Sequence, residues 1–171
     1  MTIGDFYLIK EPFKDGYLIA ATLRPETIFG VTNLWINPEA SYAKVKIKDE
    51  IWYVSEECIQ KLKDQNREVE LVESFKGIKL VGEEVSIPII NRKVIVLPAN
   101  FVDDKIATGI VNSVPAHAPY DYIAIEDLKK DISTIEKFGL DKTTIENIEP
   151  ISLIQVSGLS ELPTVAIVKK I

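Results

Sequence analysis

The sequence contains very little cysteine, histidine or methionine, each of which occurs once among 171 residues. A single cysteine excludes an internal disulfide bond and a zinc site built from cysteines, and a single histidine excludes a metal site built from several histidines. No apolar run is long enough to cross a membrane, and the first ten residues lack the pattern of a signal peptide. We therefore expect a cytoplasmic protein that holds no metal ion.

Basic residues are also in the minority, with 20 Lys and Arg against 26 Asp and Glu and a net charge of −6. This balance argues against broad, unspecific binding to nucleic acid, although it leaves room for a local basic groove. The composition does not shift along the chain, so we predict a single domain of residues 1–171. The excess of Ile, Lys and Glu resembles that of proteins from thermophiles, and an AT-rich genome gives a similar excess of Ile and Lys.

Hydrophobic alternation and turn signals predict a chain of many short strands with few helices. Strands are expected at residues 6–10, 17–23, 32–36, 44–48, 51–54, 68–72, 76–80, 83–90, 94–97, 110–114 and 151–156. Helices are expected at residues 25–30, 56–65 (with Ser55 as its N-cap), 119–130 and 143–147. Turns every eight to twelve residues predict a mainly β, α+β fold, a closed or nearly closed β-barrel with a few flanking helices.

The motifs that usually bind ATP or activate a serine nucleophile are absent, and two other segments stand out instead. In residues 21–30 a strand meets Pro25, with Thr22, Arg24 and Thr27 close to the junction. Hydroxyl groups and backbone N–H groups at a helix start suit an anionic ligand or an oxyanion. From composition alone, the same residues favour a helix cap beside an exposed arginine.

In residues 107–121 a buried strand leads through a Pro-Ala-His-Ala-Pro loop into a helix. Asp121 lies near the third position of that helix, where the helix dipole favours a carboxylate. His117 is held in the rigid loop. A purely structural role is open for both residues, and Cys58 is interpreted as a helix residue that is not a nucleophile.

Together the two segments resemble the editing domain of class I aminoacyl-tRNA synthetases for Leu, Ile and Val. The string TLRPETIFGVTNLWINP resembles the threonine-rich peptide of that domain, and TGIVNSVPAHAPYD resembles its second hallmark. Their wording is most similar to the archaeal and eukaryotic type of leucyl-tRNA synthetase. The signatures HIGH and KMSKS of the synthetic active site are absent. The resemblance therefore implies an editing domain cut out of a larger synthetase, with the strand-rich barrel of the family.

The resemblance implies hydrolysis of the ester that joins a wrong amino acid to the 3′-terminal adenosine of tRNA(Leu). Asp121 matches the carboxylate that grips the α-ammonium group of the substrate, and Thr27 matches the threonine that excludes leucine. Thr22 matches a threonine near the scissile ester, and Arg24 matches a residue near the terminal nucleotide. The other residues implied to bind substrate are Asn112, Ser113, Val114 and His117.

Two positions depart from many bacterial relatives, which have a second threonine where Leu23 stands and an aspartate where Ala118 stands. Any contact made by those groups is missing or replaced here. Because no nucleophile–base pair is visible, we expect an oriented water molecule and no covalent intermediate. The free ribose hydroxyl of the tRNA is a further candidate to assist the water.

The resemblance also implies the partners and cofactors of the domain. The expected partners are the 3′ CCA end of mischarged tRNA(Leu) and the rest of the synthetase chain, with the domain itself a monomer. No cofactor is expected for editing, since ATP and Mg²⁺ belong to the absent synthetic domain. Three alternatives remain: a non-catalytic module that binds the tRNA 3′ end, a valyl-type editing domain that clears threonyl-tRNA, and an unrelated hydrolase with a His117–Asp121 dyad.

Overall fold

The computed structural model describes residues 6–153 and the single residues 162, 164 and 168. The chain divides into two compact units. The first unit takes the chain up to Pro25 and then Leu34–Asn112, and the second takes Glu26–Asn33 and the chain from Ser113 onward. The prediction of a single domain over residues 1–171 stays a prediction. Within the described part, no helix is both long and apolar enough to cross a membrane.

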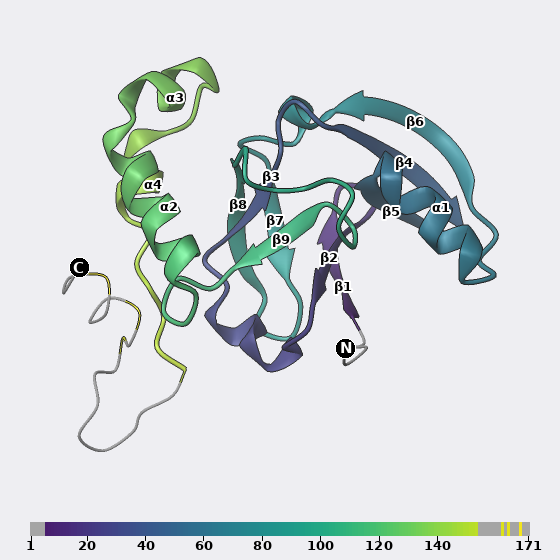
Figure 1. Cartoon of the computed structure of the whole chain (residues 1–171), viewed down its shortest axis with the longest axis horizontal. Helices are drawn as coiled ribbons and strands as arrows, with labels where there is room; N and C mark the ends of the chain where they lie inside the picture. The colour runs from purple at the N-terminus through teal and green to yellow at the C-terminus, as the bar shows by residue number, and fades with distance from the viewer. Residues whose placement is uncertain (1–5, 154–161, 163, 165–167, 169–171) are drawn as a thin grey trace. The chain divides into compact units, whose positions relative to one another are not determined.

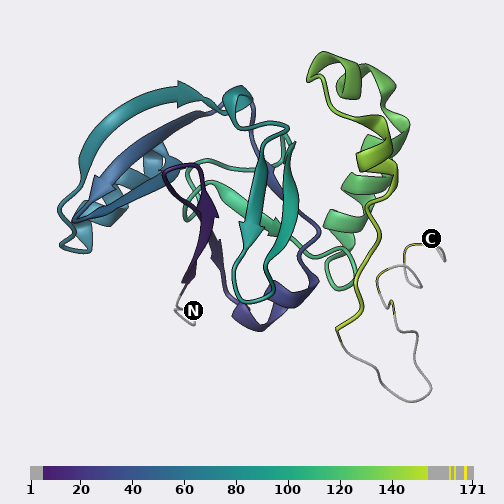
Figure 2. The same cartoon turned by 180° about the vertical axis from the view of Figure 1, so that it is seen from behind.

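The strands form two sheets. The first sheet has the order β1 (Tyr7–Phe13), β2 (Gly16–Thr22), β5 (Glu50–Ser55), β4 (Ser41–Ile47) and β6 (Glu70–Lys76). The second has the order β7 (Glu84–Ile87), β8 (Arg92–Pro98), β3 (Asn33–Ile36) and β9 (Ile110–Ser113). Figure 2 shows the long curved pair β4–β6 and the hairpin of β7 and β8 from behind. The mainly β, α+β fold is confirmed.

The predicted closed or nearly closed barrel is not confirmed, because neither sheet closes on itself among the described residues. In the first sheet β2 and β5 are parallel, and only two residue pairs connect them. The other pairings of this sheet, β1–β2, β4–β5 and β4–β6, are antiparallel and longer. Short strands predict a sheet well, but they do not say whether its two end strands pair with each other.

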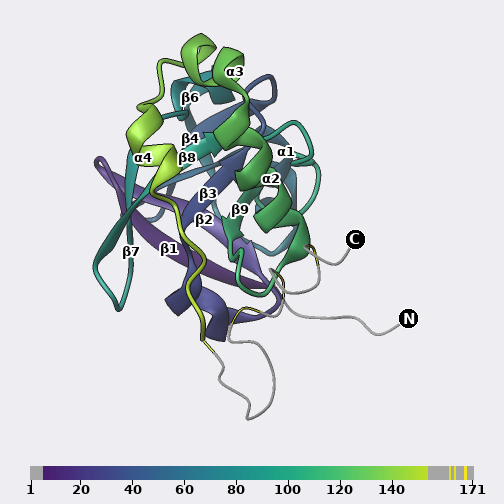
Figure 3. The ribbon, with the colours of Figure 1, turned by 90° about the vertical axis from the view of Figure 1, so that its left-hand side faces the viewer.

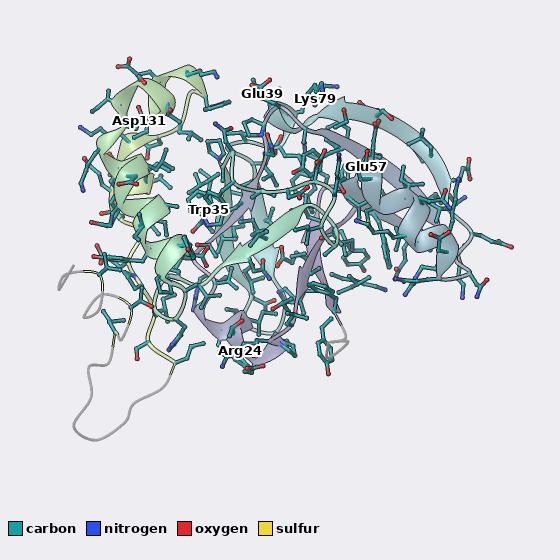
Figure 4. The ribbon with its side chains drawn as sticks, in the orientation of Figure 1. Arg24, Trp35, Glu39, Glu57, Lys79 and Asp131 are labelled. Atoms are coloured by element: carbon teal, nitrogen blue, oxygen red, sulfur yellow. The ribbon has the colours of Figure 1, made fainter. Side chains whose placement is uncertain are left out.

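Helix α1 (Glu56–Asp64) covers one face of the first sheet (Figure 1). Cys58 and Leu62 of α1 are buried in a core cluster with side chains from β2, β4 and β5, namely Ile19, Ala43, Val45, Ile47, Trp52 and Val54. On the second sheet, Trp35 is 1% exposed and meets the ring of Phe101 edge to face. Figure 4 marks Trp35 inside the first unit. Burial of these apolar side chains stabilises the unit.

Ser55 precedes α1 as predicted, but its side chain does not cap the helix. Its Oγ instead donates a hydrogen bond to the carbonyl oxygen of Asp104 at 2.8 Å, and its backbone N–H donates to the carbonyl oxygen of Thr108 at 2.9 Å. Ser55 therefore holds the loop that precedes β9 against the start of α1. This contact is distant in sequence, so the local capping pattern could not predict it.

Gly109 gives a direct test of this attachment. Its φ angle is +69°, and a Cβ there would lie 2.6 Å from the Cβ of Ser55. We expect Gly109→Ala to lower the free energy of unfolding by about 2–4 kcal/mol, because backbone strain and a clash add together. Gly139 is a matched control, with φ +62° and no atom within 4 Å of the added Cβ. Gly139→Ala should cost only about 1 kcal/mol in denaturant unfolding, and equal losses in the two variants would contradict the assigned clash.

Three predicted elements are corrected by the structure. Of the strand expected at residues 76–80, only Lys76 lies in a strand, as the last residue of β6, and the chain continues as the 3-10 helix η2 (Gly77–Lys79). The N–H of Gly77 donates to the carbonyl oxygen of Ala40, and a Cβ on Gly77 would lie 2.2 Å from the carbonyl oxygen of Asn37, so the chain turns there. The strand expected at residues 83–90 ends at Ile87 as β7. Residues 151–153 are not a strand, and the rest of the strand expected at 151–156 lies outside the described residues.

The second unit contains most of the 3-10 helix η1 (Pro25–Gly30) together with α2 (Pro119–Lys130), α3 (Ile132–Lys137) and α4 (Lys142–Glu146). Figure 3 shows α2 beside α4, with α3 following at the end of α2. Helix α2 has the predicted bounds, whereas α3 was not predicted. The side chain of Asp131, labelled in Figure 4, caps α3 by accepting from the N–H of Thr134.

Candidate functional site

The eight predicted site residues are divided between the two units. Thr22, Arg24 and Asn112 belong to the first unit, and Thr27, Ser113, Val114, His117 and Asp121 belong to the second. Within the first unit Thr22 is hydrogen-bonded to Arg24, and within the second Asp121 is hydrogen-bonded to Val114. A joint site made by all eight residues stays a prediction.

Asp121 is fixed between a helix start and the preceding loop. It is the third residue of α2, is only 8% exposed, and its Oδ2 accepts a hydrogen bond from the backbone N–H of Val114 at 2.8 Å. Pro119 opens the helix, where its missing N–H costs nothing. The carboxylate therefore lies at the positive end of the helix dipole and is tied to the end of β9. This arrangement predetermines its position before any ligand arrives.

The loop between Val114 and α2 is a compact turn. The backbone N–H groups of His117 and Ala118 both donate to the carbonyl oxygen of Val114, at 3.0 and 2.9 Å. The Nε2 atom of His117 accepts a hydrogen bond from the N–H of Leu153 at 3.2 Å. An accepting Nε2 carries no proton, so the imidazole is assigned as the neutral Nδ1–H form. In this arrangement His117 fastens residues 151–153, and its predicted contact with substrate stays a prediction.

Thr27 lies half-buried on η1, next to this loop in the second unit. A Cβ on Gly30 would lie 3.0 Å from Leu153 Cδ1 and 3.2 Å from Val114 Cγ1. Gly30 therefore lets the end of η1 pack against the loop and the Leu153 segment. The helix that carries Thr27 is thus brought against Val114, the residue bonded to Asp121.

Ser113 is fully buried, and its backbone carbonyl accepts from the N–H of Thr32 at 3.1 Å. Its Oγ has no hydrogen-bond partner among the described residues. A serine nucleophile needs an adjacent base that removes its proton. Ser113 is accordingly not arranged as a nucleophile.

In the first unit, Thr22 ends β2 and Arg24 follows it. The Oγ1 of Thr22 accepts a hydrogen bond from the backbone N–H of Arg24 at 3.0 Å, so the hydroxyl shapes the turn that leaves the strand. Its O–H remains able to donate to another group. Arg24 is exposed at the end of β2, as Figure 4 shows.

Asn112 lies half-buried on β9, where it meets a residue that the sequence reasoning did not single out. Glu11 of β1 is fully buried, and burial raises the pKa of its carboxyl group to about 8, while the side chain of Asn112 beside it acts to lower that pKa. A signal was present in the sequence: period-two alternation places Glu11 on one face with Ile9 and Phe13. A glutamate on an apolar face of a strand is informative, because glutamate is almost never fully buried unless it has a partner.

Cys58 lies in α1, as predicted, and burial raises the pKa of its thiol to about 11. A groove of about 790 Å³ runs past Cys58 in the first unit, between β1, Trp52 and the end of α1. None of the predicted site residues lines it. Among the described residues there is no group of three or more His, Cys, Asp or Glu side chains that could hold a metal ion.

The chain matches a known family by sequence. The family model described as "Leucyl-tRNA synthetase, editing domain" matches residues 12–135. Leucine–tRNA ligase from Pyrococcus furiosus is 51% identical over 177 aligned residues, which cover 99% of this chain, and the enzyme from Methanocaldococcus jannaschii is 43% identical over 183 residues with the same coverage. In both cases the chain spans only 18% of the length of the relative.

Solved structures agree with the sequence matches. A crystal structure described as GlLeuRS-CP1 has a TM-score of 0.83 at 32% identity, covering 92% of this chain and 64% of that one. The editing domain of the P. knowlesi cytosolic leucyl-tRNA synthetase also has a TM-score of 0.83, at 21% identity, covering 97% of this chain and 76% of that one. The second likeness concerns the fold alone.

Proposed function

Because this chain belongs to the family of leucyl-tRNA synthetase editing domains, we propose that it hydrolyses the ester between a noncognate amino acid, such as isoleucine or norvaline, and the 3′-terminal adenosine of tRNA(Leu). It excludes leucyl-tRNA(Leu). A leucine pocket rejects a similar aliphatic side chain by only about 1–3 kcal/mol, so a second site that removes errors is needed. The domain performs this step as part of a longer synthetase chain in the cytoplasm.

The observation that carries the proposal is the fixed carboxylate of Asp121. Its Oδ2 is bonded to the N–H of Val114 at 2.8 Å, at the start of α2. In the proposed complex Asp121 binds the α-ammonium group of the amino acid. A charge-assisted hydrogen bond of this kind fixes both the position and the orientation of the ester. A ligand that lacks the ammonium group gains nothing from this contact.

Hydrolysis then proceeds by a positioned water molecule. The water oxygen attacks the ester carbonyl carbon, the carbonyl oxygen becomes an oxyanion, and the bond to the ribose oxygen breaks as that oxygen takes up a proton. Thr22 donates its O–H to the carbonyl oxygen or orients the water, since its Oγ1 is already held by the N–H of Arg24. The neighbouring ribose hydroxyl assists the proton transfer. Orientation and oxyanion stabilisation supply the rate enhancement without a covalent intermediate.

The remaining residues bind the nucleotide. Arg24 pairs with the phosphate or ribose of the terminal nucleotide, and the adenosine is contacted by Asn112, Ser113, Val114 and His117. The partner is the CCA end of the tRNA, presented by the rest of the synthetase to a monomeric domain. No metal or cofactor takes part, and ATP and Mg²⁺ serve the synthetic domain. The net charge of −6 is consistent with a domain that relies on its parent chain for much of its grip on tRNA.

In this proposal Thr27 excludes leucine from the site. Removal of its side chain should therefore allow leucine to bind. In calorimetric titrations, non-hydrolysable 3′-aminoacyl-adenosine analogues carrying norvaline or isoleucine should bind the wild type, and the leucine analogue should not. Thr27→Ala should strengthen binding of the leucine analogue about tenfold or more, because the side chain that crowds its branched end is gone. Thr143→Ala is the matched control, since Thr143 is an exposed threonine on α4 of the same unit.

Two outcomes would overturn the proposal. One is a folded wild-type protein, in its full-length synthetase, that binds mischarged tRNA without cleaving the ester, which is the behaviour of a non-catalytic module. The other is a preference of the wild type for a threonine analogue over norvaline, which is the behaviour of a valyl-type domain. If Thr27→Ala still rejects the leucine analogue as strongly as the wild type does, Thr27 does not set the specificity.

A further inference from the structure

Glu11 is a carboxyl group inside the first unit. It faces Leu18 across the β1–β2 hairpin and shares its face of β1 with Ile9 and Phe13. Its side chain is 0% exposed. The same face of the hairpin continues at the strand end with Tyr7 opposite Thr22, the proposed catalytic threonine. Glu11 is therefore buried on the same face of the hairpin as Thr22.

Among the described residues, no neighbouring charge contributes to the shifted pKa of Glu11. Strands β2 and β9 contain no acidic or basic residue. Strand β7 contains Glu84, which is exposed and forms an ion pair with Lys93 at 3.5 Å. On β1 itself, Lys10 points to Glu50 and bonds it through both carboxylate oxygens. The group that lies beside Glu11 is the side chain of Asn112.

The polar atoms of this pair are buried with unused hydrogen-bonding capacity. Among the described residues, Oε1 and Oε2 of Glu11 and Oδ1 of Asn112 are buried and have no well-aligned partner. Three such atoms close together need an explanation, because most buried polar atoms in proteins are paired. The explanation must supply a donor for Asn112 Oδ1, since oxygen atoms alone cannot bond to one another.

A neutral carboxyl group meets this need and a carboxylate does not. Its O–H donates to the amide oxygen, and its carbonyl oxygen accepts from the amide N–H, which gives two hydrogen bonds in a ring. A carboxylate can only accept and would leave Oδ1 unpaired. The ring fixes the plane of the Asn112 amide. It leaves one amide N–H of Asn112 for a ligand.

We propose that Glu11 is a positioning residue whose uncharged carboxyl group pairs with Asn112 and holds its amide in the orientation that contacts the terminal adenosine. The role of Asn112 as an adenosine ligand rests on the proposed function. The pairing of Glu11 with Asn112 does not. The two statements are tested separately.

The pairing is tested directly by the ¹³C chemical shift of the Glu11 side-chain carboxyl group in the full chain. In the wild type it should titrate with a midpoint near pH 8. In Asn112→Ala the midpoint should differ measurably from that of the wild type, because the side chain that hydrogen-bonds the carboxyl group is lost, and an unchanged midpoint would overturn the pairing. A midpoint near 4.5 in the folded wild type would overturn the pairing, whatever the protein does to tRNA.

The positioning role is tested by binding of the isoleucyl-adenosine analogue to the full-length synthetase. Glu11→Gln should bind within about twofold of the wild type at pH 7, because an amide also forms the two-bond ring with Asn112. Glu11→Leu, of similar size, should lose about tenfold, and adding Asn112→Ala should cause no further loss. Glu84→Gln and Glu84→Leu on β7 are the matched controls and should bind as the wild type.

The pH profile separates positioning from mere packing. Above pH 8 the wild type should lose affinity relative to Glu11→Gln, since ionised Glu11 has no O–H to donate. The ratio of the two affinities is compared at each pH, so the titration of the ligand's own ammonium group cancels. A constant ratio, or a folded Glu11→Leu that binds as the wild type, would overturn the positioning role. If the wild type itself binds no analogue, the proposed function fails, and the ¹³C titration still decides the pairing.

Discussion

Asp121→Ala should reduce the deacylation of isoleucyl-tRNA(Leu) by the full-length synthetase about a hundredfold, because a hydrogen bond to a charged group contributes roughly 1.5–3 kcal/mol. The carboxylate is proposed to bind the α-ammonium group of the substrate. The variant has a second effect that must be separated from the first. It also leaves the N–H of Val114 without the acceptor that lies 2.8 Å away in the wild type.

Asp121→Asn separates the two effects. An amide oxygen can still accept from the N–H of Val114, whereas the negative charge that attracts the ammonium group is gone. We expect Asp121→Asn to lose deacylation nearly as far as Asp121→Ala does. Its free energy of unfolding should fall by less than about 1 kcal/mol, compared with about 1–3 kcal/mol for the alanine variant.

Asp127→Ala is the control for this pair of variants, because Asp127 is an exposed aspartate on the same helix. It should change neither the deacylation rate nor the Val114 bond. If Asp121→Asn deacylates isoleucyl-tRNA(Leu) as the wild type does, the charge of Asp121 is not used on the substrate. Asp121 would then act only on the loop and the helix start.

The local features of this fold follow from local signals in the sequence. Helix α2 has the predicted bounds, Pro119 to Lys130, because a proline at its first position and a carboxylate at its third are both signals that act within one turn. The hairpin between β1 and β2 turns at Lys14 and Asp15, just before Gly16, where the turn residues are again a local signal. The order of strands in the sheets depends on contacts between distant residues, and for this reason the predicted closed barrel was not confirmed.

The errors also have a common physical cause. Gly77 was placed in a strand because its neighbours alternate, but the close approach of the Asn37 carbonyl oxygen forces a turn there. The hydroxyl group of Ser55 was expected on its own helix and bonds Asp104 instead. Local propensity is overridden in each case by a partner about forty to fifty residues away in the chain.

The candidate site was found through the family resemblance more than through the physics of single residues. Asp121 alone is compatible with a helix-stabilising role, and only the resemblance implies that it binds the α-ammonium group of a substrate. Glu11 shows the opposite case, since it belongs to neither recognised motif. The alternation of Ile9, Glu11 and Phe13 would have predicted its burial, but only the structure places Asn112 beside it.

The burial of Glu11 has a large effect on stability that depends on pH. The pKa of its carboxyl group is raised from 4.5 to about 8 in the folded protein, so folding favours the protonated form. Between these values the folded state binds one more proton than the unfolded state, and stability falls by about 1.4 kcal/mol for each pH unit. Below pH 4.5 the cost is absent, and above pH 8 it is constant because both states are ionised.

Glu11→Gln should therefore stabilise the protein by roughly 3 kcal/mol at pH 7, since a neutral amide keeps the pairing with Asn112 and has no proton to lose. The free energy of unfolding of the wild type and the variant should be nearly equal near pH 4.5 and should diverge as the pH rises to 8. Denaturant unfolding of both proteins over this range measures the divergence. Glu84→Gln, at an exposed position on β7, should follow the wild type at every pH. Parallel curves for the wild type and Glu11→Gln would mean that Glu11 is ionised in the folded protein, and then Asn112 would lack the donor that a neutral acid provides.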